Sequence, residues 1–111
     1  MKSCVKINYL SEIIDSYDIF FIDLWGVIHN GVSVFDNVIF VLESLKKKNK
    51  MVFFITNAPR RSFVISEQLK EFGIKADLYD KIVSSGELTW NTMKEKYQRK
   101  NCLMIGPPRD N

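Results

Sequence analysis

The sequence has few of the residues that mark disulfide-rich or metal-cluster proteins. Its 111 residues include two cysteines, Cys4 and Cys102, and one histidine, His29. Two cysteines this far apart form neither a disulfide framework nor a metal-ligand pattern. We therefore expect free thiols in a reducing cytoplasm.

Long apolar runs are also lacking. No segment approaches the length of a membrane span, and no extended apolar stretch follows the basic start of the chain as it would in a signal peptide. The charge is nearly balanced, with 16 basic and 13 acidic residues and a net charge of +3. Such a small excess does not indicate nucleic-acid binding. We expect a cytoplasmic protein that binds neither membrane nor nucleic acid.

Hydrophobic patterns predict strands and helices in alternation. Apolar runs at 19–22, 51–55, 81–83 and 102–105 predict strands. The runs at 19–22 and 51–55 lack polar alternation, which is typical of strands buried on both faces. A short helix is expected from Ser11. Three longer helices are predicted from apolar side chains on one face: Val38, Val41, Leu42 and Leu45; Ile65, Leu69 and Phe72; and Trp90, Met93 and Tyr97. This order indicates an α/β fold with a parallel sheet.

Polar residues mark the expected helix ends. Asp36 is a candidate N-cap for the first long helix. Gly73 is well placed just after the second. Ser84 and Glu87 have the spacing of a capping box at the start of the third, which favours a capping role for Glu87 over an acid–base role.

Two expected strands end in residues that suit phosphate chemistry. Asp23 follows the first strand, and Thr56 and Asn57 end the second. Ligands bind beyond the carboxyl ends of parallel strands, so these residues are expected to border one crevice. A carboxylate, a hydroxyl and backbone N–H groups would suit a phosphoryl group. Taken singly, Asp23 reads equally well as a loop residue, and Thr56-Asn57 as a turn.

The segments around these residues resemble a known family. Residues 21–31, Phe-Ile-Asp-Leu-Trp-Gly-Val-Ile-His-Asn-Gly, resemble the first motif of the haloacid dehalogenase-like superfamily. Residues 55–61, Ile-Thr-Asn-Ala-Pro-Arg-Arg, resemble the second motif of its class IIA branch, and 79–87 resemble the segment that follows. The resemblance implies a Rossmann-like core over 1–84 and the beginning of an inserted cap domain over 85–111.

The resemblance also implies roles for individual residues. Asp23 would attack a substrate phosphorus and form an aspartyl-phosphate. Its other oxygen and the backbone carbonyl of Trp25 would bind Mg²⁺. Thr56, with the backbone of Asn57, would hold the transferring phosphoryl group. The implied substrate is a small phosphorylated metabolite.

The sequence departs from the family pattern in its acid–base residue. Most phosphatases of this superfamily have a second Asp where this chain has Trp25, which cannot exchange protons. His29 lies on the same loop and could substitute, although a solvated loop histidine is the simpler interpretation. Arg60 and Arg61 could grip an anionic substrate, or they could be solvated first-turn arginines.

The family's third and fourth motifs lie beyond a cap, and this chain stops at Asn111. We therefore expect a truncated chain that is an inactive or weak phosphatase. One alternative is a catalytically incompetent remnant that binds phosphate or assembles with a second copy. A flavodoxin-like domain is disfavoured because no glycine-rich phosphate loop follows the first strand. A partial sheet would leave Phe20, Phe21 or Phe53 uncovered and favour a homodimer.

Overall fold

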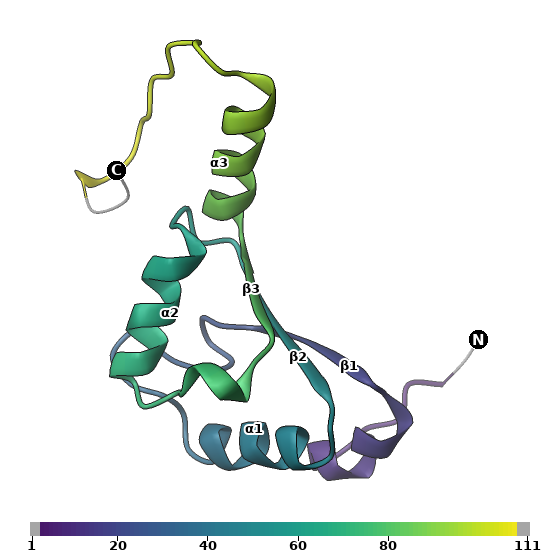
Figure 1. Ribbon diagram of the computed structural model, residues 1–111. Helices are drawn as coiled ribbons and strands as arrows, with labels where there is room; N and C mark the ends of the chain where they lie inside the picture. The colour runs from purple at the N-terminus through teal and green to yellow at the C-terminus, as the bar shows by residue number, and fades with distance from the viewer. Residues whose placement is uncertain (1–2, 109–111) are drawn as a thin grey trace.

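A computed structural model describes residues 3–108 as an open three-stranded sheet with helices (Figure 1). All strands are parallel, in the order β1-β2-β3. The predicted α/β fold with a parallel, Rossmann-like sheet is confirmed. The elements are β1 (Ile19–Asp23), α1 (Val38–Lys47), β2 (Met51–Thr56), α2 (Ser62–Glu71), β3 (Lys81–Ser84) and α3 (Ser85–Lys96), with 3-10 turns η1 (Leu10–Glu12), η2 (Ile14–Ser16) and η3 (Ala76–Leu78).

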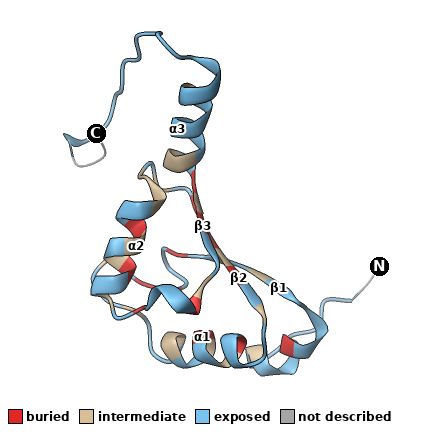
Figure 2. Cartoon of the chain, viewed as in Figure 1, coloured by how far each residue is buried: buried red, intermediate tan, exposed pale blue. Residues whose placement is uncertain are grey.

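The hydrophobic core lies on one face of the sheet, between the strands and helices α1 and α2 (Figure 2). Right-handed crossovers that add parallel strands in one direction place successive helices on the same face. The side chains that meet there are fully or almost fully buried: Val52 and Phe54 from β2, Ile82 from β3, Leu42 and Leu45 from α1, and Ile65 and Leu69 from α2. The helical stripes predicted for α1 and α2 are therefore confirmed.

The opposite face of the sheet is largely uncovered. Ile19, Phe21 and Asp23 alternate with half-buried residues along β1, and the Phe21 side chain is 67% exposed. Met51 and Ile55 of β2 are exposed on the same face. The prediction that these strands are buried on both faces is wrong within the described residues, because α1 and α2 both pack on the other side. The expected exposure of Phe21 is confirmed.

This uncovered face leads us to expect self-association. Phe21 packs on Phe53 at a ring-centroid distance of 5.6 Å, so the exposed apolar groups form a continuous surface with Ile55. Exposed apolar patches and unpaired strand edges favour association between chains. We expect light scattering of the purified chain to report a dimer, and a lysine at position 21 to shift it toward monomer. A monodisperse wild-type monomer would contradict this expectation.

The ends of the helices agree only in part with prediction. Asp36 does not cap α1. The N-cap position is held by Asn37, which has the left-handed conformation with φ 64° and makes no side-chain cap hydrogen bond. The Val38 N–H donates instead to the Phe35 carbonyl at 3.4 Å, so a backbone turn starts the helix. Gly73 follows α2 with φ 88°, as predicted. The predicted helix from Ser11 is replaced by the two short turns η1 and η2.

Helix α3 extends away from the body of the molecule (Figure 1) and contains no buried residue. Trp90 is 42% exposed, so the apolar side chains predicted on one face of this helix do not reach the core within the described residues. The strand predicted at 102–105 is not formed, because α3 carries the chain away from the edge of β3 that a fourth strand would need. Residues 109–111 of the expected cap region lie outside the described residues. No helix within 3–108 is long and apolar enough to span a membrane.

Candidate functional site

The carboxyl ends of β1 and β2 lie side by side. Asp23, the last residue of β1, is paired in register with Ile55, one residue before the end of β2. Strand alternation therefore places Asp23 on the uncovered face, with Phe21, and Thr56 on the packed face, with Phe54. Exposure follows this pattern, since Asp23 is exposed and Thr56 is only 8% exposed.

A cavity of about 280 Å³ opens at these strand ends. It brings together five residues proposed from the sequence: Trp25, His29, Thr56, Asn57 and Arg60. The remaining walls are formed by Leu24, Ala58 and Pro59, and by Ile65 and Gln68 of α2. Asp23 is not among the lining residues, but it directly precedes Leu24, which is.

The loop after β1 is folded tightly on itself. The Leu24 carbonyl accepts hydrogen bonds from the N–H groups of Ile28 and His29, at 2.8 and 3.2 Å. The Trp25 ring lies so close to Gly31 that a Cβ on this glycine would be 2.2 Å from the ring. Gly31 also has φ 88°, which disfavours other residues. Gly31 therefore makes room for the Trp25 ring, which its place in the sequence does not reveal.

His29 is buried, and the prediction of a solvated loop histidine is wrong. Its side chain lies against the rings of Trp25 and Phe72, at centroid distances of 5.8 and 5.2 Å. Its Nδ1 accepts the Gly31 N–H at 3.0 Å, so we assign the imidazole proton to Nε2. Burial lowers the pKa of His29, and the negative charge of Asp23 partly opposes this effect. At neutral pH the ring is therefore uncharged and is better suited to donate a hydrogen bond than to supply a proton.

The lowered pKa of His29 predicts a specific loss of stability in mild acid. The unfolded chain binds a proton near pH 6.5, whereas the folded chain resists it. Stability should be intact above pH 6.5 and fall as the pH drops from there toward the folded-state pKa. Urea unfolding between pH 7.5 and 5 measures this slope, which His29→Gln should reduce. An unchanged slope in the variant would assign the acid sensitivity to other groups.

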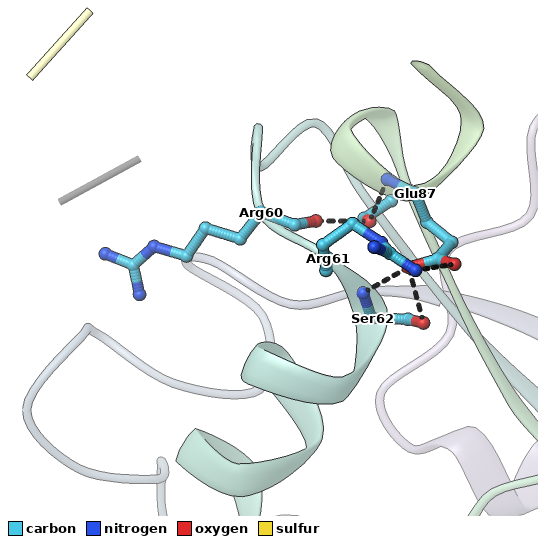
Figure 3. Close-up of polar contacts among 5 residues, drawn as sticks. Arg60, Arg61, Ser62 and Glu87 are labelled. Carbon is cyan, nitrogen blue, oxygen red and sulfur yellow. Dashed lines mark hydrogen bonds and ion pairs between the residues drawn. The ribbon is translucent and has the colours of Figure 1, made fainter. Parts of the chain in front are cut away.

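The turn after β2 presents groups that suit an anion. The Thr56 Oγ1 accepts the Ala58 N–H at 3.2 Å, which leaves its own O–H available to donate. Asn57 is exposed at the cavity. Figure 3 shows the Arg60 guanidinium extending away from the neighbouring Glu87, and Arg60 also lines the cavity. A hydroxyl, backbone and side-chain amides and a guanidinium are the donors expected around a phosphoryl group.

Arg61 binds Glu87 (Figure 3) and is not among the residues that line the cavity. The Glu87 carboxylate accepts hydrogen bonds from Arg61 Nε at 2.9 Å and Nη2 at 3.2 Å. It also accepts the Ser62 N–H at 2.9 Å and the Ser62 Oγ–H at 3.0 Å. These bonds, led by that from Arg61, lower the pKa of Glu87 to about 2. The Arg61 guanidinium also stacks on the Trp90 ring, with its Cζ 3.7 Å from the ring centroid. The two adjacent arginines therefore have different surroundings: Arg60 lines the cavity, and Arg61 contacts α3.

The capping role predicted for Glu87 is only half confirmed. The Ser84 Oγ does accept the Glu87 N–H, at 3.0 Å. The carboxylate, however, binds the first residue of α2 instead of returning to the start of its own helix. The sequence carried no signal for this contact, because Glu87 and Ser62 are 25 positions apart.

Comparisons with known proteins place this chain in a family. The family model for haloacid dehalogenase-like hydrolases matches residues 20–111. A haloacid dehalogenase-like hydrolase from Brucella suis 1330 has 32% identity and a TM-score of 0.78, over 91% of this chain and 36% of its own. A structure from Cytophaga hutchinsonii ATCC 33406, described as a possible sugar phosphatase, has 23% identity and a TM-score of 0.69, over 84% of this chain and 33% of its own. This chain therefore spans about a third of those two chains. None of the curated proteins matches it.

Proposed function

The chain belongs to the haloacid dehalogenase-like hydrolases, and on this basis we propose that it provides the nucleophile and phosphate-binding groups of a phosphohydrolase. The proposed substrate is a small phosphorylated metabolite. The observation that carries the proposal is the cavity at the strand ends, where Thr56, Asn57 and Arg60 lie next to the loop that follows Asp23.

The proposed reaction has two displacement steps at phosphorus. An Asp23 carboxylate oxygen bonds to the substrate phosphorus as the bond to the leaving oxygen breaks. Water then attacks the aspartyl-phosphate, which releases phosphate and restores Asp23. The covalent intermediate divides one difficult hydrolysis into two easier steps. Thr56 and the backbone of Asn57 would hold the phosphoryl oxygens during both steps, with Arg60 as a further contact.

The oxygen atoms near Asp23 fit a Mg²⁺ ion. The Asp23 carboxylate is exposed, and its Oδ1 accepts the Leu24 N–H at 2.8 Å. The Trp25 carbonyl accepts none of the backbone hydrogen bonds of this loop. Mg²⁺ prefers such oxygen ligands and usually keeps several waters. We propose that Asp23 and the Trp25 carbonyl hold the ion, which would neutralise charge on the phosphoryl oxygens.

Proton transfer is the weak part of the proposed chemistry. Trp25 occupies the usual acid position, and the pKa of His29 is lowered by burial. His29 is therefore proposed as a hydrogen-bond donor at the cavity. General acid–base catalysis contributes about 10²- to 10⁴-fold in rate. We expect slow turnover, and Trp25 also supports the alternative of a phosphate-binding module without turnover.

The expected cytoplasmic location also stays a proposal. Cys4 and Cys102 are both free and exposed in the structure. Exposed, unpaired thiols are typical of proteins in a reducing compartment.

Binding of inorganic phosphate in the presence of Mg²⁺, measured by calorimetry, tests the proposed function. Thr56→Val preserves shape and removes the hydroxyl, so we expect roughly 10-fold or greater loss of affinity, as for a hydrogen bond to a charged group. Thr89→Val, on the exposed surface of α3, is the matched control and should bind as the wild type does. Equal affinity in Thr56→Val would contradict the assignment.

Turnover of p-nitrophenyl phosphate with Mg²⁺ separates the two versions of the proposal. Slow turnover that is lost in Asp23→Asn would support the phosphohydrolase. Phosphate binding without turnover would support the binding module. Turnover at a rate typical of enzymes, also lost in Asp23→Asn, would show that Trp25 does not limit the chemistry.

A further inference from the structure

Helix α3 is joined to the body of the molecule by a small polar cluster at its first turn. The helix has no buried residue of its own, and Figure 2 shows it blue along most of its length. Its first turn instead contacts the turn that connects β2 to α2 (Figure 3). This turn also carries the proposed anion-binding groups.

Three backbone groups of that turn are held from the β3–α3 junction. The Gly86 N–H donates to the Ala58 carbonyl at 3.1 Å. The Ser84 Oγ–H, fully buried, donates to the Arg60 carbonyl at 2.6 Å. The Ser62 N–H donates to Glu87 at 2.9 Å. The turn is thus bound at every second residue, at positions 58, 60 and 62.

The same segment lines the cavity. Every residue from Thr56 to Arg60 borders it, while the Ala58 and Arg60 carbonyls and the Ser62 N–H are bound from the junction. The conformation of the anion-binding turn is therefore set by residues on a different element. Among these groups Glu87 is the charged one: its carboxylate also pairs with Arg61, and its pKa is lowered to about 2.

We propose that Glu87 is a positioning residue for the anion-binding turn. It acts through Arg61 and Ser62 and contacts neither phosphate nor metal. Arg61 strengthens the arrangement because its guanidinium is held between the Glu87 carboxylate and the Trp90 ring, 3.7 Å away. The inference rests on the proposed function for its effect on phosphate binding. Its effect on the turn itself is independent of that function.

The test compares three variants of the full chain. Glu87→Gln keeps the size of the side chain and removes its charge. Glu95→Gln makes the same charge change on an exposed position of α3. Ile74→Val lowers stability from the buried core, away from the cavity lining, and reports what general destabilisation does. Each variant is measured under conditions where circular dichroism shows it to be folded.

Two readouts are needed. In the absence of ligand, backbone amide exchange by NMR should become faster for the N–H groups within 57–62, which are those of residues 57, 58 and 60–62, in Glu87→Gln alone. With Mg²⁺ and inorganic phosphate, the affinity of Glu87→Gln should fall roughly 5- to 10-fold as charge-assisted hydrogen bonds are replaced by neutral ones. Both controls should retain the wild-type affinity.

The outcomes distinguish this inference from the proposed function. Faster exchange at 57–62 together with weaker phosphate binding supports both. If the wild type binds no phosphate, the proposed function fails, and faster exchange at 57–62 still supports positioning of the turn by Glu87. If Glu87→Gln exchanges at 57–62 as Ile74→Val does, or binds phosphate as tightly as the wild type does, the inference is overturned.

Discussion

Replacement of Gly86 by alanine is expected to destabilise the fold by about 3 kcal/mol, at the upper end of the effects of overpacking. A Cβ at this position would lie 2.4 Å from the carbonyl carbon and oxygen of Pro59 and 2.5 Å from the Arg60 oxygen. These atoms belong to the backbone and cannot rotate away as the end of a side chain could. The added methyl would therefore push apart the two segments that the Ser84 and Glu87 hydrogen bonds join.

Thermal and urea unfolding of Gly86→Ala and Gly106→Ala measure this effect under matched conditions. A Cβ on Gly106 would meet only the end of the flexible Met104 side chain, 2.9 Å from its Cε, so little change is expected there. Because the turn at Ala58–Arg60 must move, Gly86→Ala should also weaken phosphate binding. Unfolding at the wild-type midpoint would show that the junction is looser than the structure indicates.

Replacement of Phe54 by alanine should have an effect of similar or greater size. Phe54 is the largest fully buried side chain, with 0% exposure, and its ring packs on Tyr79 at 5.0 Å. Removal of a buried phenylalanine costs about 3–5 kcal/mol, from lost burial and from the cavity left behind. Native domains are stable by only about 5–15 kcal/mol, so this variant is expected to be partly or fully unfolded at room temperature.

Phe21→Ala is the matched comparison, since it removes the same ring from the other face of the sheet. In the monomer Phe21 is 67% exposed and contacts Phe53, so its loss should cost under about 1 kcal/mol at protein concentrations too low for self-association. Chemical denaturation followed by far-UV circular dichroism at such concentrations reports both values. Equal destabilisation of the monomer by the two substitutions would mean that its sheet is covered on both faces.

These two phenylalanines also show where prediction from the sequence reached its limit. The apolar runs at 19–22 and 51–55 correctly predicted β1 and β2, because a short run of consecutive apolar residues is itself typical of a strand in a parallel sheet. Whether each face of the sheet is covered depends on which helices pack on it. The sequence of a single strand does not contain this information. The apolar segment at 102–105 had the composition of a strand but, in the structure, lies next to no sheet edge.

The residues of the candidate site also fall into two groups: those that could be predicted from the sequence, and those that depend on contacts between distant segments. Asp23 and Thr56 could be proposed from their positions at strand ends, because parallel topology alone brings such ends together. The burial of His29 depends on how its loop folds back against Phe72, 43 positions later in the chain. Likewise, the difference between Arg60 and Arg61 is decided by Glu87, so adjacent identical residues could not be told apart before the fold was known.

The strands lie in the sheet in the same order as in the sequence, and this order affects how the chain can fold during its synthesis. Within residues 3–108 the sheet runs β1-β2-β3, so each crossover adds a strand to an edge that already exists and none of these strands must enter between two others. A ribosome adds about 5–20 residues per second, and folding starts with the segments that emerge first. β1, α1 and β2 can therefore pair before β3 has been synthesised. The nascent chain would gain the loop of the proposed nucleophile early, and the turn after β2 would gain its hydrogen bonds to the β3–α3 junction only later.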